Sequence, residues 1–189
     1  MNHKIWKLLF SVFAAGLIYS CTPSDEVTPS FVYDLSSFSF NQNKYNLDKG
    51  FIINYGKDNP VNGNNINLNL ISGGISIYDK SGIIDSARGF GHLLFFEMYS
   101  YSNTELLTGR YNFDHNYNRK PFTFDSGRGF LNMDLPDQSS QAFQISQGTM
   151  DVINTGQGNY EIKFDCKNYQ GEQVKGAYKG KLKYYNYSY

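Results

Sequence analysis

The residues best suited to chemistry are one carboxylate and two tyrosines near the end of a strongly apolar segment. Glu97 follows the apolar run 93–96, and Tyr99 and Tyr101 have the same strand parity as Glu97. Aromatic rings beside polar groups can stack on sugar rings, and residues 102–104 supply polar groups. We predict that Glu97, Tyr99 and Tyr101 bind a saccharide without cleaving it. The alternative is that both tyrosines pack in or around the core and that Glu97 is a hydrogen-bonded residue at a strand exit.

The sequence does not contain the patterns that the common catalytic and metal chemistries require. Glycoside hydrolysis needs two carboxylates that flank the sugar, and Glu97 is the only acid inside a strongly apolar segment. Zinc sites need a cluster of His and Cys, and His92 and His115 form no such motif. We therefore predict no catalytic residue, no metal site, no cofactor and no enzyme activity.

The charge balance argues against nucleic acid as a partner. The chain has 17 Lys and Arg against 17 Asp and Glu, which gives a net charge of zero. Nucleic-acid-binding proteins instead concentrate positive charge. A hydrophobic content of 40% indicates a packed chain, and 189 residues are typical of a single domain.

The first twenty residues have the features of an export signal. Lys4 and Lys7 form a positive region, and an apolar stretch covers residues 8–18. This stretch is shorter than the roughly 20 residues that a transmembrane helix needs. We predict a signal peptide over residues 1–20.

The residues around the first cysteine suggest a lipid anchor. Ile18-Tyr19-Ser20-Cys21 resembles the lipobox of bacterial lipoproteins, and this resemblance implies that Cys21 carries acyl chains that hold the protein on a membrane. Residues 22–29 are polar with two prolines, and we predict a tether over residues 21–35. Asp25-Glu26 resembles the acidic signal that directs Bacteroidota-type lipoproteins to the exterior face of the outer membrane. The alternative is an ordinary secretory signal with a coincidental cysteine.

The second cysteine lies in a clear strand pattern. Residues 160–167 alternate between apolar and charged side chains, which is the periodicity of a half-buried strand. We predict that Cys166 is buried beside Ile162 and Phe164 as a small hydrophobic residue. The alternative is a nucleophilic thiol, which would need a base nearby.

Composition and turn spacing predict an all-β fold. The chain has 16 Tyr and 15 Phe, which favour strands, and many Asn and Gly residues, which favour turns. We predict one domain over residues 36–189, an antiparallel β-sandwich of jelly-roll type with about ten strands, and a calycin-like β-barrel as the alternative. The candidate strands lie near 37–41, 44–48, 50–56, 66–72, 74–78, 91–101, 107–113, 127–135, 142–153, 159–167 and 173–186.

Two local features carry further expectations. The run 93–96 is apolar at every position, so something must cover the outer face of its strand: another segment of the chain, an apolar ligand or a partner. The hexapeptides at 85–90 and 125–130 are nearly identical. We interpret them as a repeated turn that leads into a strand, and the alternative is a paired ligand site formed by Arg88 and Arg128.

The C-terminal strands carry a second resemblance. The patterns Gly158-x-Tyr160-x-Ile162-x-Phe164 and Gly176-x-Tyr178-x-Gly180-x-Leu182, with Gly148-Thr149 before them, resemble the terminal meander of small uncharacterised Bacteroidota-type outer-membrane lipoproteins. The resemblance implies an all-β fold and an outer-membrane location, and it implies no reaction. We therefore predict a surface-anchored, non-enzymatic binding module for a glycan or an envelope protein. The alternatives are a carrier of a small apolar ligand in a barrel-like interior and, third, a hydrolase.

Overall fold

A computed structural model describes residues 36–137 and 139–188, and these residues form an all-β fold, as predicted. None of them belongs to a helix that is long and apolar enough to span a membrane. The predicted signal peptide, the predicted tether and Cys21 lie outside the described residues. The strands are β1 (Ser37–Phe40), β2 (Asn43–Asn46), β3 (Lys49–Gly56), β4 (Asn64–Ile71), β5 (Ile75–Lys80), β6 (Ile83–Ser100), β7 (Gly109–Phe113), β8 (Thr123–Asp134), β9 (Ser139–Gly156), β10 (Asn159–Asn168) and β11 (Gln173–Asn186).

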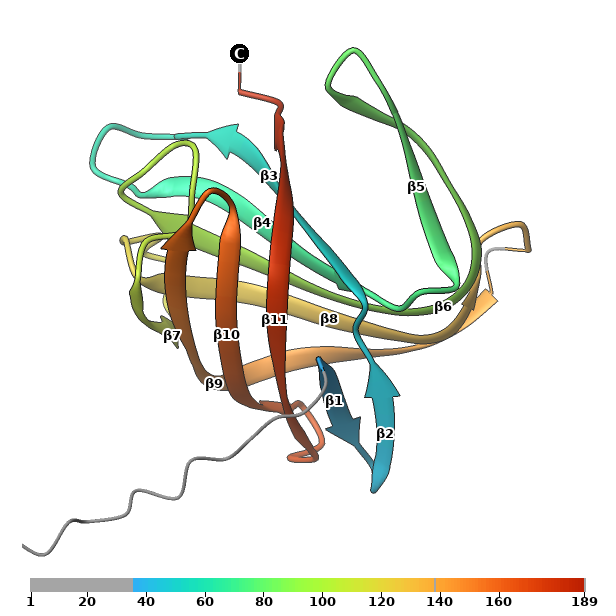
Figure 1. Cartoon of the computed structure of the whole chain (residues 1–189). Helices are drawn as coiled ribbons and strands as arrows, with labels where there is room; N and C mark the ends of the chain where they lie inside the picture. The colour runs from blue at the N-terminus through green and yellow to red at the C-terminus, as the bar shows by residue number, and fades with distance from the viewer. Residues whose placement is uncertain (1–35, 138, 189) are drawn as a thin grey trace, which may run out of the picture. The chain divides into compact units, whose positions relative to one another are not determined.

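The strands pair into one sheet that closes on itself (Figure 1). The order is β10-β9-β7-β8-β6-β4-β3-β11, and the pairing of β11 with β10 completes the ring. β1 and β2 extend from the edge of β11 that also pairs with β3. The strand pairing is therefore closed, as we expected for the β-barrel that was the alternative to the β-sandwich.

Two strand pairs differ from the fully antiparallel sheet that we expected. β3 runs parallel to β11, and the short β7 runs parallel to β8. The first difference has a geometric cause. Because β8 and β9 also pair directly, the ring can be traced without the short β7 as β3-β4-β6-β8-β9-β10-β11. This ring contains an odd number of strands, so antiparallel pairing cannot continue all the way round. The mismatch falls where the last strand meets the first long strand.

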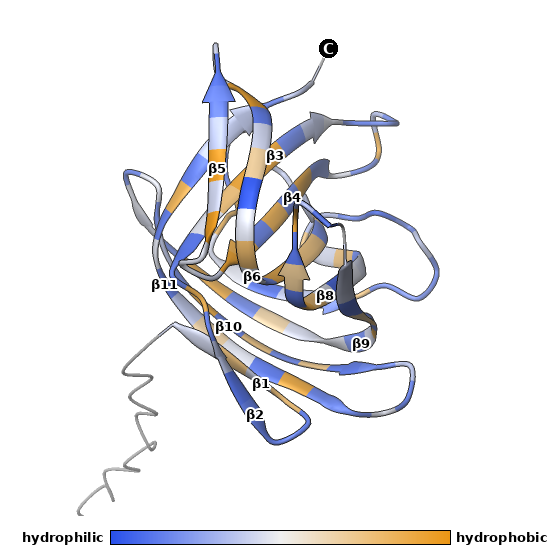
Figure 2. Cartoon of the chain, turned by 90° about the vertical axis from the view of Figure 1, so that its right-hand side faces the viewer, coloured by the Kyte–Doolittle hydropathy of each residue, from blue (hydrophilic) through white to orange (hydrophobic). Residues whose placement is uncertain are grey.

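Alternating side chains fill the interior of the ring. Leu94, Phe96 and Met98 of β6 belong to the main core, together with apolar residues of all the other ring strands. Figure 2 shows apolar and polar residues alternating along the strands. Cys166 packs in the same core and is 1% exposed, which confirms the prediction of a buried thiol. Burial raises the pKa of the Cys166 thiol to about 12, so the nucleophilic thiolate is strongly disfavoured.

A hairpin covers part of the outer face. β5 pairs with the first half of β6, and this hairpin folds back over β3, β4 and β11. Its apolar side chains pack with Phe51, Leu93 and Tyr185 in a second, smaller core. The backbone N–H of Ile84 donates to the Tyr187 hydroxyl at 2.8 Å, which fastens the hairpin to the end of β11. Another segment of the chain therefore covers the Leu93 end of the doubly apolar run.

Glycines allow the hairpin to leave the sheet at a sharp angle. Gly89 has a φ of +113°, which favours glycine, and a Cβ there would lie 2.1 Å from the carbonyl oxygen of Gly74. A Cβ on Gly74 would in turn lie 2.1 Å from the carbonyl oxygen of Phe90. Only glycine therefore fits at positions 74 and 89, where the backbones of the two hairpin segments approach each other closely.

The repeated hexapeptides do not form turns. Residues 85–90 lie inside β6 and residues 125–130 lie inside β8, so the interpretation as a repeated turn is wrong. Turn-forming residue types are tolerated here because the first copy bends away in the hairpin and the second contains the glycines of a crowded sheet. Arg88 lies on the hairpin, 6.0 Å from the ring centre of Tyr78, whereas Arg128 lies opposite Phe95 on the neighbouring strand.

Candidate functional site

The outer face of β6 and β8 carries a groove that the hairpin does not fill. Three cross-strand pairs line it: Leu93 with Phe130, Phe95 with Arg128, and Glu97 with Ser126. The hollow has a volume of about 420 Å³, which is within the range of small-ligand sites. We call this six-residue surface the outer groove.

Two aromatic rings give the outer groove an apolar wall. Phe95 and Phe130 are partly exposed, and neither belongs to the main core or to the smaller core under the hairpin. The hairpin covers Leu93 but leaves these rings accessible. They are the surfaces on which a flat or ring-shaped ligand can stack.

The carboxylate of Glu97 is held at one end of the outer groove. Its Oε1 accepts hydrogen bonds from Asn65 Nδ2 at 2.7 Å and from the Tyr99 hydroxyl at 3.2 Å. Its Oε2 makes no hydrogen bond within the described part of the chain, so this oxygen can accept one from a ligand. The side-chain oxygens of Asn65 and Asn67, on the next strand, are buried acceptors without a partner among the described residues.

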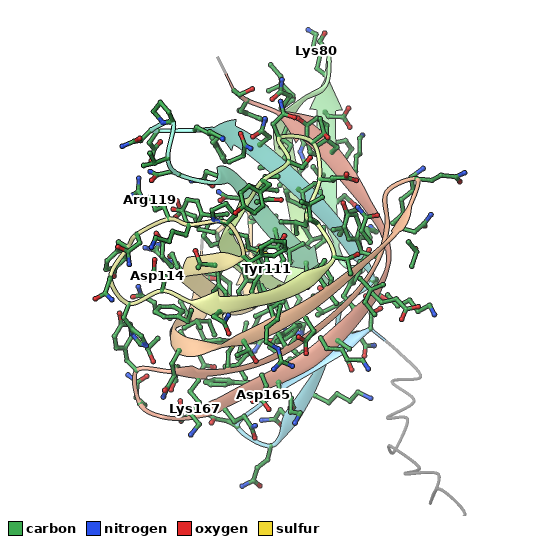
Figure 3. All side chains as sticks on the ribbon, turned by 90° about the vertical axis from the view of Figure 1, so that its left-hand side faces the viewer. Lys80, Tyr111, Asp114, Arg119, Asp165 and Lys167 are labelled. Carbon is green, nitrogen blue, oxygen red and sulfur yellow. The ribbon has the colours of Figure 1, made fainter. Side chains whose placement is uncertain are left out.

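A buried polar cluster supports Glu97 from below. The Tyr99 hydroxyl also lies 3.0 Å from Oδ2 of Asp125, which in turn lies 3.7 Å from Nε of Arg119 on the loop between β7 and β8 (Figure 3). Burial raises the pKa of Asp125, and the nearby charge of Glu97 adds to this effect, although the Tyr99 hydrogen bond opposes it. Burial and the two carboxylates also raise the pKa of Tyr99. The tyrosine hydroxyl is therefore neutral and links both acids.

The predicted strip of Glu97, Tyr99 and Tyr101 does not form. Tyr99 is 1% exposed, so its ring cannot stack on a sugar, and we correct that prediction. Tyr101 is 67% exposed but follows the last residue of β6, where its ring contacts Phe122 instead of the other two residues. Only Glu97 lines the outer groove. Strand alternation predicted an exposed Tyr99, and this was wrong because the loop that carries Arg119 closes over the end of β6.

Sequence reasoning missed Phe130 and Ser126 as groove residues, and it named Arg128 only in an alternative site with Arg88 and Phe95 only as part of the run that needs a cover. One signal was present, because the doubly apolar run requires a cover and the hairpin supplies it for Leu93 alone. The contribution of β8 was hidden, since it depends on the β6–β8 register and on a bulge between Gly91 and Leu93. A short sequence pattern does not determine which residues of two distant strands pair with each other.

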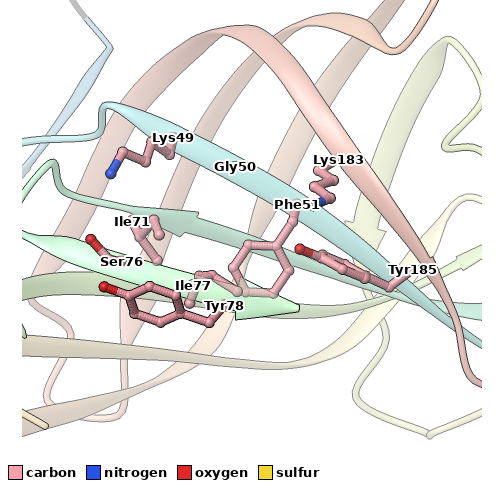
Figure 4. Close-up of a pocket in the computed structure, with 9 residues that line it drawn as sticks. All are labelled: Lys49, Gly50, Phe51, Ile71, Ser76, Ile77, Tyr78, Lys183 and Tyr185. Atoms are coloured by element: carbon pink, nitrogen blue, oxygen red, sulfur yellow. The ribbon is translucent and has the colours of Figure 1, made fainter. Parts of the chain in front are cut away.

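A second hollow lies between the hairpin and β3 and β11 (Figure 4). It has a volume of about 390 Å³ and walls that include Phe51, Tyr78 and Tyr185. Its two cations are already engaged, since Lys183 pairs with Asp79 of the hairpin and Lys49 donates to backbone carbonyls. The outer groove is therefore the better candidate, because it offers both rings and free polar atoms.

Among residues 36–137 and 139–188, no group of three or more His, Cys, Asp or Glu side chains is arranged to hold a metal ion. Comparisons with protein-family models, with curated proteins and with solved structures found no match to this chain.

Proposed function

We propose that this protein is a surface-anchored lipoprotein of the outer membrane whose folded domain binds a saccharide in the outer groove without cleaving it. The observation that carries the proposal is the combination of two uncovered rings, Phe95 and Phe130, with the fixed carboxylate of Glu97 in one hollow. Rings that stack and carboxylates that accept from hydroxyls are what recognition of a sugar requires. The lipobox at Cys21 supports the membrane anchor.

The position of the second acid supports binding over hydrolysis. Asp125 is linked to Glu97 through Tyr99, but Asp125 is only 5% exposed and contacts Arg119. A hydrolase needs both carboxyl groups in contact with the sugar, on either side of the scissile bond. In this arrangement only Glu97 reaches the outer groove, and Asp125 positions it through Tyr99.

The filled interior also supports an external site. The inner faces of the ring strands carry large, fully buried side chains, including Phe96, whose ring contacts Phe124, and Tyr111, whose ring contacts Phe122. A carrier would need an apolar cavity of several hundred cubic ångströms inside the ring. The outer groove, which is of that size and has free polar groups, lies on the outer face instead.

The test is binding of the purified protein to a glycan panel, with and without substitutions in the outer groove. We expect saturable binding to at least one saccharide, no reducing ends released over hours, and loss of binding in the Phe95→Ala, Phe130→Ala double variant. Release of reducing ends would show hydrolysis instead. An absence of binding across the panel would reject the saccharide site.

An envelope protein is the second candidate partner, and the hairpin favours it. Tyr78, Ile83 and Phe90 are exposed on this hairpin, and exposed apolar residues on a projecting element are typical of protein contacts. Photo-crosslinking from position 90 in intact cells tests this candidate. A single crosslinked envelope protein would support it, and crosslinking to many proteins or to none would not.

A further inference from the structure

We propose that the ligand of the outer groove is an acidic saccharide, whose carboxylate pairs with Arg128 while its hydroxyls donate to Glu97. This inference rests on the proposed saccharide function and adds the chemical class of the sugar.

The guanidinium of Arg128 differs from the others in the chain. Arg110 pairs with Asp151, with nitrogen–oxygen distances of 2.7 and 2.9 Å. Arg119 pairs with two aspartates, and Arg88 lies over an aromatic ring. Arg128 is exposed and has neither a hydrogen bond nor an ion pair within the described residues. The arginine without a partner is therefore the one in the outer groove.

The position of Arg128 suits a charged group on a stacked ring. It stands directly opposite Phe95, with Leu93 and Phe130 in the row on one side and Glu97 and Ser126 in the row on the other. Diagonal neighbours across two strands, such as Arg128 and Glu97, lie roughly 7–8 Å apart. One sugar ring with its substituents can span this distance and contact both residues.

The chemistry of the two charged residues favours an anion at one end and hydroxyls at the other. The planar fork of a guanidinium binds a carboxylate through two parallel hydrogen bonds, which are stronger than bonds between neutral groups. Glu97 can only accept hydrogen bonds when ionised, so it selects hydroxyls and repels a second anion. A sugar that carries one carboxylate per ring satisfies both residues.

The experiment compares matched oligosaccharides that differ only in charge. The full-length protein is titrated with oligogalacturonate and oligoglucuronate, and with the neutral oligosaccharides made by reducing their carboxylates. We expect about tenfold tighter binding of the acidic member of at least one pair at low salt, and a smaller preference at high salt. Arg128→Gln should abolish the preference for the acidic member of the pair. Arg128→Lys should restore part of it.

The matched control is Arg110→Gln, which removes an arginine on β7 outside the outer groove and should leave the preference unchanged. Equal affinity of the wild type for both members of every pair would overturn the acidic-sugar inference and leave saccharide binding intact. Tighter binding of a sulfated oligosaccharide with the same backbone would show that the anionic group of the ligand is a sulfate, and it would overturn the assignment of a carboxylate. An absence of binding to every member would reject the proposed function as well.

Discussion

At the residue scale, the Tyr99 hydroxyl connects the two acids near the outer groove. It has one hydrogen to donate and lies within hydrogen-bond distance of Glu97 and Asp125. Asp125 is buried deeply enough that its charged form is disfavoured. This buried acid should affect stability in a pH-dependent way, whereas Glu97 at the groove should affect binding.

Asp125→Asn should therefore change the pH dependence of stability. Because folding raises the pKa of Asp125, its contribution to stability is fully present below the unfolded value of about 4 and is lost as pH rises through the folded value. The free energy of unfolding of the wild type relative to Asp125→Asn should fall between pH 4 and pH 7. Each unit of pKa difference corresponds to about 1.4 kcal/mol. Urea unfolding at several pH values measures this quantity.

Asp137→Asn is the control, because Asp137 is exposed on the turn after β8. Asp137→Asn should leave the free energy of unfolding at pH 7 within about 0.5 kcal/mol of the wild type, as is usual for surface substitutions. A wild type that gains stability over Asp125→Asn as pH rises would contradict the assigned role of the buried acid.

The Cys166 thiol should be inert in the folded protein. It is 1% exposed, and burial raises its pKa to about 12, so very little thiolate exists at pH 8. A thiol reagent at pH 8 should label Cys166 at least a hundredfold more slowly in the native protein than in urea. Rapid native labelling would mean that β10 does not present this face to the core.

At the element scale, the β5–β6 hairpin decides which part of the outer face remains open. It packs on Phe51, Leu93 and Tyr185 and is joined to β11 by Tyr187 and by the Lys183–Asp79 ion pair. This packing leaves the two rings of the outer groove uncovered. The angle of the hairpin depends on the glycines at its base.

Gly89→Ala should destabilise the protein more than Gly82→Ala. Both glycines have positive φ, so both substitutions strain the backbone by about 1–2 kcal/mol. A Cβ on Gly82 meets no atom within 4 Å, whereas one on Gly89 meets the Gly74 carbonyl oxygen at 2.1 Å. We expect Gly89→Ala to cost at least about 2 kcal/mol more in urea unfolding. Equal costs would show that the strand crossing is not as tight as described.

The elements were largely predictable from the sequence, but the site was not. Strict alternation in 160–167 and 173–186 predicted β10 and β11 because these strands have one apolar and one charged face. The hexapeptide 85–90 was misassigned, since its Asp, Ser and Gly residues favour turns locally, whereas its pairing with β5 keeps it extended in the hairpin. Likewise, Tyr99 is buried because Asp125 and Arg119, which are remote in sequence, close over it.

At the scale of the whole molecule, the side chains that stabilise the fold lie inside the closed ring, and the proposed binding site lies outside it. Its interior is packed with side chains, and the proposed ligand site lies on the outer face. The odd number of strands places a parallel pair, β3 and β11, beside the hairpin. The hairpin and the outer groove both lie on the outside of the ring.

Cys21→Ala should release the protein from the membrane fraction. The binding energy of the proposed anchor resides in acyl chains, at about 0.8 kcal/mol per buried CH₂, and of the two cysteines only Cys21 follows residues that resemble a lipobox. Cell fractionation and labelling with a fatty acid measure the effect. Cys166→Ala removes the other cysteine and should leave the protein on the membrane. A Cys21→Ala protein that still sediments with membranes, together with an unlabelled wild type, would contradict the lipoprotein proposal.

The central claim is that a saccharide binds in the outer groove, and affinity measurements on three ring variants test it most directly. Phe95→Ala and Phe130→Ala each remove a groove ring, whereas Tyr101→Ala removes an exposed ring outside it. Stacked aromatic contacts contribute about 0.5–1.5 kcal/mol beyond area burial. With a saccharide identified from the panel, each groove variant should therefore raise Kd roughly two- to tenfold while the protein stays folded at the assay temperature, and Tyr101→Ala should leave Kd unchanged. A loss of affinity in Tyr101→Ala alone would place the site at the end of β6 and contradict the account.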